Sequence, residues 1–404
     1  MSIKNLFSIA LTVLLSACAD ADPARQQFLA PPGSMAPEIN IGGDGRAYLS
    51  WLEKSGSGHA LRYAVYDDAG WGVARTVAQG GNWFVNWADF PSVTTLGNGT
   101  LAAQWLQRSG EVGHAYDIAL TFSRDGGATW DAPFTPHDDG TETQHGFVTL
   151  LPSGSDRLQL FWLDGRNTSG HDEVSAELHS AMTLRFAEYD GQGKIVDAGE
   201  LDARTCSCCQ TSAVNTSSGP LVAYRDRTAE EIRDIVTVSR NNGRWQEPQL
   251  VAQDGWHIEA CPVNGPSLDA RESIVAGAWF TGAGDVPKVQ VAFADGDGRN
   301  FGTPRRVDAG RALGRVDVVL LGSESALVSW VELAGDQAQV VWRQIHRDGR
   351  MGVPETLVRL DPSRLSGFPR MVRRGDDVLI AWTEGDAKAR QVRAIVRPAR
   401  SLGL

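Results

Sequence analysis

The sequence predicts an all-β protein, a β-propeller of seven four-stranded blades, from two observations. The first is an apolar run that closes on an aromatic residue and recurs seven times in the 404 residues. The second is a strand-like run after each copy, in several copies followed by a polar hairpin turn. A unit of about four short antiparallel strands that is repeated around a ring is a propeller blade, and such a unit cannot bury both faces alone.

The recurring aromatic residue sets the period of the repeat. Successive copies lie 51 to 62 residues apart. The seven positions are Trp51, Trp105, Trp162, Tyr224, Trp279, Trp330 and Trp382. Because the period is nearly constant, we expect one closed ring, with six blades and an extra hairpin as the alternative. The seventh unit has only three strands before Ala399, so we expect residues 26–30 to supply its outer strand.

One hairpin turn is built from residues with separate roles. Asp125 can accept hydrogen bonds from the backbone of the turn, and Gly127 tolerates a positive φ. Trp130 offers an apolar face to a neighbouring strand, and Ser123 precedes the turn. This Ser-x-Asp-x-Gly-x-x-Trp pattern resembles the Asp-box of the sialidase-like β-propellers. In that superfamily the box turns lie away from the active site, so the resemblance implies a structural role for Ser123, Asp125, Gly127 and Trp130.

The beginning of the chain predicts a lipoprotein signal peptide over residues 1–17. The apolar run from Leu6 to Leu15 is too short to span a membrane. It ends in Leu15-Ser16-Ala17-Cys18, which resembles the lipobox of bacterial lipoproteins; an ordinary signal peptide is the alternative. Cleavage would leave a lipid on Cys18, a flexible tether over residues 18–34 and one propeller domain over residues 35–404. We therefore expect a cell-envelope protein that is held to the membrane by its lipid anchor.

The charge of the chain limits its partners. The formal net charge is −11 at pH 7. An acidic protein is repelled by the phosphates of nucleic acids, so we expect no nucleic-acid partner.

Four of the five cysteines fall in two neighbouring connectors between repeats. Cys206, Cys208 and Cys209 lie between the third and fourth units, and Cys261 lies with His257 between the fourth and fifth. The repeat makes these connectors equivalent, so we expect Cys261 to lie close to the other three.

Two interpretations of this cysteine group stay open. In an oxidising compartment four cysteines form disulfides with three connectivities, and a bond from Cys261 would join two blades. Alternatively, the thiolates bind a soft metal ion, Cu or Zn, with His257 and with His145 from the preceding connector as further ligands.

The resemblance to sialidases implies a further hypothesis, glycan hydrolysis. Sialidases use three arginines, a Tyr–Glu nucleophile pair and an aspartate acid/base. This chain begins its first unit with Pro37-Glu38-Ile39, without the arginine of the family pattern, and its last tyrosine is Tyr224. The remaining acid candidates are Asp89, Asp164, Asp226 and Glu259.

Two functions therefore remain after the sequence is read. The first is an envelope lipoprotein that binds a ligand, such as a soft metal ion, at the face that carries the cysteines. The second is a glycoside hydrolase of the exo-α-sialidase type acting on a glycan. We prefer the first because the sialidase residues cannot be recovered from the sequence.

Overall fold

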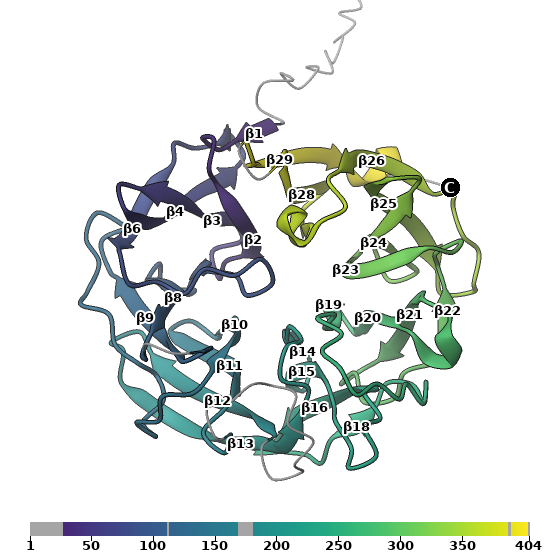
Figure 1. Ribbon diagram of the computed structural model, residues 1–404, viewed down its shortest axis with the longest axis horizontal. Coiled ribbons are helices and arrows are strands. Elements are labelled where there is room, and N and C mark those ends of the chain that lie inside the picture. The colour runs from purple at the N-terminus through teal and green to yellow at the C-terminus, as the bar shows by residue number, and fades with distance from the viewer. Residues whose placement is uncertain (1–26, 111–112, 169–180, 387–388, 403–404) are drawn as a thin grey trace, which may run out of the picture.

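The computed structural model describes residues 27–110, 113–168, 181–386 and 389–402. Seven β-sheets stand around one centre in these residues (Figure 1). This confirms the predicted seven-bladed propeller. Cys18 and the predicted signal peptide over residues 1–17 lie outside the described residues. Within the described ranges, no helix has the length and apolar character that crossing a bilayer requires.

The first four blades follow one another along the chain, each beginning with the strand nearest the centre (Figure 1). Blade 1 comprises β2 (Met35–Ile41), β3 (Ala47–Ser55), β4 (Gly58–Asp67), β5 (Gly70–Trp71) and β6 (Arg75–Gly80); blade 2 comprises β7 (Ser92–Thr95), β8 (Leu101–Arg108) and β9 (Tyr116–Ser123); blade 3 comprises β10 (His145–Ser153), β11 (Arg157–Asp164), β12 (Met182–Asp190) and β13 (Ile195–Thr205); blade 4 comprises β14 (Ser212–Thr216), β15 (Gly219–Arg225), β16 (Ile235–Asn241), β17 (Arg244–Trp245) and β18 (Gln249–Leu250). The outer strand of blade 2 is reduced to an antiparallel bridge between Leu120 and Phe134.

The last three blades complete the ring and include the first strand of the chain. Blade 5 comprises β19 (Ser267–Arg271), β20 (Ile274–Thr281), β21 (Lys288–Asp295) and β22 (Arg305–Arg306); blade 6 comprises β23 (Ala312–Leu320), β24 (Ser325–Ala334), β25 (Gln337–His346) and β26 (Glu355–Leu360); blade 7 comprises β27 (Arg370–Arg374), β28 (Asp377–Glu384), β29 (Gln391–Pro398) and β1 (Gln27–Leu29). Three short 3-10 helices are described: η2 (Ala283–Asp285), η3 (Arg364–Ser366) and η4 (Ala399–Leu402).

The two ends of the propeller chain meet in blade 7. Strand β1 pairs antiparallel with β29, with Phe28 opposite Ala394, and the two strands lie side by side in Figure 1. Ser34 adds a contact of the same kind, because its buried hydroxyl accepts a hydrogen bond from the backbone N–H of Val392 over 2.8 Å. The expectation that residues 26–30 complete the seventh blade is thus confirmed for 27–29. The predicted boundary between tether and propeller, at residues 34 and 35, is wrong, because β1 and Ser34 already belong to the propeller. Pairing with β1 covers the edge of β29 and joins the two ends of the chain in one sheet.

The recurring aromatic residues form the core between the blades. All seven lie in the second strand of a blade and are at most 4% exposed. Four of the tryptophans donate their indole N–H to a carboxylate two residues later. These pairs are Trp51–Glu53, Trp162–Asp164, Trp330–Glu332 and Trp382–Glu384. The carboxylate at this position satisfies a buried donor and is a repeated structural feature of the fold.

The turn over residues 123–130 has the hydrogen bonds that its sequence predicts. Oδ1 of Asp125 accepts hydrogen bonds from the backbone N–H groups of Ala128 and Thr129, at 3.0 and 2.9 Å. Trp130 packs edge-on against Tyr63 of β4 in blade 1, with ring centroids 6.2 Å apart. The turn therefore joins two blades.

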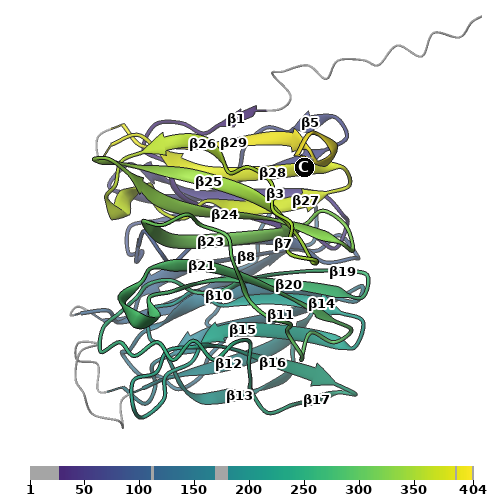
Figure 2. The same ribbon diagram turned by 90° about the vertical axis from the view of Figure 1, so that its right-hand side faces the viewer.

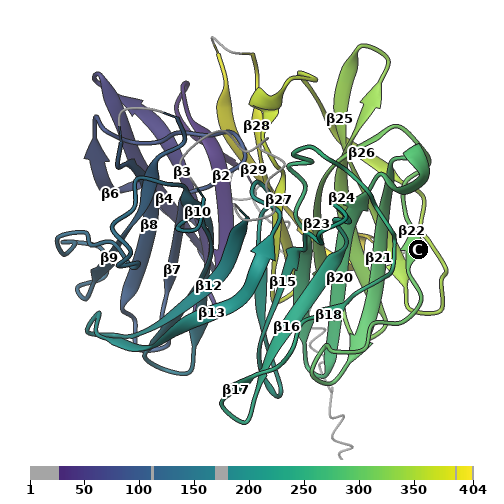
Figure 3. The ribbon, with the colours of Figure 1, turned by 60° about the horizontal axis from the view of Figure 1, so that its bottom comes forward.

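The strands run roughly along the axis of the ring (Figure 2, Figure 3). Successive strands of a blade are antiparallel. Connectors that enter the first strands and loops between second and third strands therefore gather on one face, which we call the connector face. The turn over residues 123–130 lies at the opposite face. The candidate sites described next belong to the connector face.

Candidate functional site

A disulfide joins the two connectors that flank blade 4. Cys208, between β13 and β14, is bonded to Cys261, between β18 and β19, with their Cα atoms 6.1 Å apart. The expectation that Cys261 lies within bonding distance of the Cys206–Cys209 run is confirmed. Of the three possible partners of Cys261, the structure pairs it with Cys208, while Cys206 and Cys209 carry no disulfide.

The other two cysteines form a buried pair beside this disulfide. Cys206 and Cys209 are 0% and 1% exposed and carry no disulfide. Their Sγ atoms lie 2.6 Å apart, and Sγ of Cys206 lies 3.8 Å from Sγ of Cys208. Two sulfur donors thus converge in the interior of the connector face.

A buried guanidinium lies beside this pair. The side chain of Arg225 is 1% exposed and donates to three backbone carbonyls, those of Arg233, Asn264 and Phe280. It also lies over the ring of Trp256, 4.8 Å from its centroid. Among the described residues, no carboxylate forms an ion pair with Arg225. A buried charge needs a compensating one, and the charge of Arg225 acts on the thiols of both Cys206 and Cys209.

The charges around the pair make the two thiols unlike. Burial raises the pKa of a thiol, but at Cys206 the hydrogen bond from Cys209 and the charges of Arg233 and Arg225 outweigh it, and the pKa is lowered. Burial, together with the hydrogen bond to Cys206, raises the pKa of Cys209. The pair therefore favours one thiolate, on Cys206, hydrogen-bonded to one thiol. A thiolate is the form that reacts and that binds metals.

His257 lies outside this sulfur group. Its side chain is 58% exposed, and its Nε2 lies 3.8 Å from a carboxylate oxygen of Glu259, whose side chain is 77% exposed. The sulfurs of Cys206, Cys208 and Cys209 lie within 4.8 Å of one another, and among the described residues they are the potential metal ligands grouped beside blade 4. The ligand set expected from the sequence is therefore corrected: neither His257 nor the disulfide-bonded Cys261 supplies a free ligand to it.

The four acid candidates have separate environments. Asp89 accepts hydrogen bonds from the backbone N–H of Phe147 and from the hydroxyl of Tyr116, which links blades 2 and 3. Burial raises the pKa of Asp89 to about 7, and burial also raises the pKa of Asp226 to about 6. Asp164 forms an ion pair with Arg166 and accepts a hydrogen bond from the indole N–H of Trp162. The side chain of Glu259 is exposed. Each of these carboxylates thus has its own set of partners.

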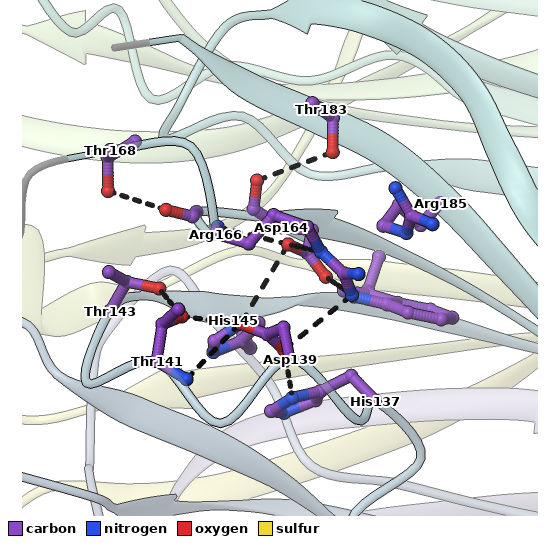
Figure 4. A network of polar contacts seen from close by, with 12 residues as sticks. His137, Asp139, Thr141, Thr143, His145, Asp164, Arg166, Thr168, Thr183 and Arg185 are labelled. Carbon is purple, nitrogen blue, oxygen red and sulfur yellow. Dashed lines mark hydrogen bonds and ion pairs between the residues drawn. The ribbon is translucent and has the colours of Figure 1, made fainter.

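A second polar group was not predicted as a unit. His145, which the sequence analysis considered beside the cysteines, instead lies with His137, Asp139 and Asp164 (Figure 4). The rings of His137 and His145 are stacked, with centroids 3.7 Å apart. The sequence offers one signal for this group, two histidines and several aspartates in the single connector between blades 2 and 3. Arg225 is a further residue that the sequence analysis did not identify as a neighbour of Cys206.

No protein-family model and no curated protein matches the chain. Three solved structures that resemble it are a polysaccharide lyase, Uly1, a Hadza microbial sialidase, Hz136, and an alpha-L-arabinanase of Penicillium chrysogenum in complex with arabinobiose. For Uly1 the identity is 10% and the TM-score 0.51, over 92% of this chain and 91% of that chain. For Hz136 the identity is 12% and the TM-score 0.47, over 86% of this chain and 75% of that chain. For the arabinanase they are 12% and 0.49, over 94% and 98%. At such identities the likeness concerns the fold alone, which in this chain is a seven-bladed β-propeller.

Proposed function

We propose that this chain is a cell-envelope lipoprotein whose propeller binds a soft metal ion through Cys206 and Cys209. One observation carries the proposal: these two cysteines are buried and free of disulfide, and their sulfurs lie 2.6 Å apart, whereas Cys208 and Cys261 are bonded to each other. A buried pair of sulfurs offers ligands for an ion that prefers thiolates. Since a metal–thiolate bond is about 2.3 Å long, binding would move the two sulfurs at least about 1 Å further apart.

The number of ligands and the local charge favour Cu(I) over Zn(II). Structural zinc sites in proteins are almost always four-coordinate, and only two sulfurs are free here. Two thiolates and one Cu(I) carry a net charge of −1, which the neighbouring guanidiniums of Arg225 and Arg233 would stabilise. A Zn(II) ion on the same two thiolates would be neutral and would gain less from these cations.

The disulfide supports this role by fixing the loop that bears the pair. Cys208 lies between Cys206 and Cys209 and is tied to the next connector through Cys261. The amide of Gln210 is also held, because it donates to the backbone carbonyl of Ala88 over 2.7 Å. A loop fixed at several points keeps its two sulfurs together without the conformational entropy that a free loop would lose on binding.

The membrane anchor of the proposal rests on the sequence of residues 15–18. A lipid on Cys18 would place the propeller outside the cytoplasm, at the membrane surface, where residues 18–26, ahead of β1, would link it to the anchor. Changing Cys18→Ala should release the protein from the membrane fraction into the soluble one. A variant that stays in the membrane fraction would contradict the anchor.

The metal site is tested by titrating full-length protein, extracted in detergent, with Cu(I) under anaerobic conditions against a chromogenic copper chelator. We expect the protein to retain one equivalent of Cu(I), and we expect Cys206→Ser and Cys209→Ser each to abolish that retention. His257→Ala, at an exposed residue of the adjoining connector, is the matched control and should retain copper. The site would be refuted if both serine variants retained as much copper as the unaltered protein, or if the unaltered protein retained none.

Glycoside hydrolysis is the second candidate, and one observation favours it. Asp89 lines a central cavity of about 220 Å³, and its pKa is raised to about 7 by burial. A general acid in a glycosidase needs a carboxyl that is still protonated near neutral pH. Tyr224, the last tyrosine of the chain, is 0% exposed and is therefore not placed to act as the tyrosine nucleophile that sialidases use. Turnover of a glycoside reporter that Asp89→Asn abolishes and Asp125→Asn leaves intact would support this function.

A further inference from the structure

Three potential ligand atoms converge beside blade 2, away from the cysteines. They are Oδ1 of Asp117, on β9, Nε2 of His137, in the connector that follows, and Nδ1 of His145, at the start of β10. The Asp117 oxygen lies 3.7 Å from the His137 nitrogen and 3.3 Å from the His145 nitrogen. All three atoms lie within 4.8 Å of one another.

Each of these three atoms is buried, and their contacts with one another, at 3.3 and 3.7 Å, lack good hydrogen-bond geometry. The side chains of His145 and His137 are 0% and 4% exposed, so bulk water does not reach the two rings freely. Buried polar atoms in native proteins are nearly always satisfied. Three unsatisfied atoms pointing at one place indicate a group that binds there.

The opposite nitrogens of both rings are held by a single carboxylate. Nδ1 of His137 lies 3.0 Å from Oδ1 of Asp139, and Nε2 of His145 lies 3.2 Å from Oδ2 of the same residue (Figure 4). Asp139 in turn accepts a hydrogen bond from the hydroxyl of Thr141. A carboxylate that accepts the N–H on one side of an imidazole leaves a lone pair on the other side. This is the arrangement found around histidines that bind metals.

The charges around the group have a surplus of two negative units. Asp117, Asp139 and Asp164 contribute three carboxylates, and Arg166 contributes one guanidinium. Nε of Arg166 lies 2.8 Å from Asp164, and its Nη2 lies 3.6 Å from Asp139. With both imidazoles neutral, a divalent cation would balance the group.

We propose that Asp117, His137 and His145 bind a divalent transition-metal ion of the zinc type. Ligand atoms in a tetrahedral zinc site lie about 2.0–2.1 Å from the metal, hence about 3.3–3.5 Å from one another, which is close to the 3.3 and 3.7 Å observed here. Two imidazoles and one carboxylate form the three-ligand set of sites that keep a fourth position open. Asp139 is a positioning residue that fixes both rings. The proposal is independent of the copper site.

The test uses full-length protein stripped of metal with a chelator and titrated with Co(II), which replaces zinc and absorbs in the visible range. We expect one equivalent to bind, with visible bands, without a thiolate-to-cobalt charge-transfer band, and with displacement by Zn(II). The double variant Cys206→Ser/Cys209→Ser should bind equally well, which separates this site from the copper site. Asp117→Asn and His137→Gln should lose the bands, and Asp139→Asn should weaken binding by about 10–100-fold.

His257→Gln, at an exposed histidine, is the matched control and should bind as the unaltered protein does. If His137→Gln fails to fold, Asp117→Asn decides, since the Asp117 side chain is 29% exposed and asparagine has nearly the same shape. Absence of stoichiometric Co(II), binding that Asp117→Asn leaves unchanged, or a charge-transfer band from thiolate ligands would overturn the proposal. The first outcome would mean that the histidines and carboxylates form ion pairs without a metal.

Discussion

The side-chain amide of Gln144 donates a hydrogen bond to the backbone carbonyl of Ser207 over 3.0 Å. Gln144 precedes His145 in the chain, and Ser207 lies between Cys206 and Cys208. The connector that carries the histidines and the connector that carries the cysteines are therefore in direct contact on the connector face. The two proposed metal sites thus lie on connectors at either side of blade 3 that are joined by this hydrogen bond.

The disulfide between Cys208 and Cys261 should contribute strongly to the stability of the fold. It joins residues 53 apart in the sequence, so it restricts the unfolded chain over a long loop. We expect Cys208→Ser/Cys261→Ser to lower the free energy of unfolding by about 2–5 kcal/mol, measured by urea denaturation. The matched control is His257→Ala, on the same connector as Cys261, which should change it by less than about 0.5 kcal/mol. Equal stability of the double variant and the control would contradict a structural role for the bond.

Two adjacent glycines in the turn over residues 123–130 offer a matched comparison. Both have positive φ, +72° at Gly126 and +85° at Gly127, so alanine at either costs about 1–2 kcal/mol of backbone strain. A Cβ at Gly126 meets no atom within 4 Å, whereas one at Gly127 would lie 2.0 Å from the buried hydroxyl of Tyr63. We expect Gly127→Ala to destabilise by about 1–3 kcal/mol more than Gly126→Ala. Thermal unfolding of both variants measures the difference, and equal melting temperatures would show that the turn does not pack on blade 1 as described.

Because Asp89 ionises less readily in the folded protein, the free energy of unfolding should fall as the pH rises. In the unfolded chain an aspartate ionises near pH 4, whereas burial raises the pKa of Asp89 in the folded protein to about 7. Between these values the folded state binds more protons, so the free energy of unfolding decreases with pH, by about 4 kcal/mol from this residue alone. Asp89→Asn cannot ionise and should flatten the profile between about pH 4 and pH 7, measured by urea denaturation at each pH. Parallel profiles for the two proteins would contradict this account.

The architecture was predictable because the repeat is encoded in single residues. A large aromatic residue in the second strand of each blade must be buried between neighbouring blades. The number of such residues therefore gives the number of blades. The missing outer strand of the seventh unit left one place for residues 27–29. Blade 2 departs from the four-stranded pattern, because its outer strand is only a bridge at Phe134. The turn that precedes it gives no indication of how many residues will pair afterwards.

The sites were less predictable because they depend on the direction of side chains in irregular connectors. The repeat places Cys261 beside the other cysteines, but it does not say that Cys208 faces it while Cys206 and Cys209 face each other. His137, Asp139 and His145 meet only through the path of a long connector, which no periodic pattern fixes.

Asp164 was open to a better interpretation from the sequence. Three of the other repeats also place a carboxylate two residues after the recurring tryptophan, at Glu53, Glu332 and Glu384. That pattern indicates a structural partner for the indole N–H, as the structure shows. A candidate catalytic acid that recurs at the same position of several blades is better explained by the fold than by a single active site.

The most direct test of the account is a residue-specific map of the cysteines in protein denatured without reductant, alkylated and analysed by mass spectrometry of its peptides. The account predicts a cross-linked peptide pair through Cys208 and Cys261, with Cys206 and Cys209 both alkylated. Protein denatured after reduction, with all four alkylated, is the control. A second disulfide between Cys206 and Cys209 in the protein as isolated, or a bond from Cys261 to either of them, would contradict the proposed metal pair.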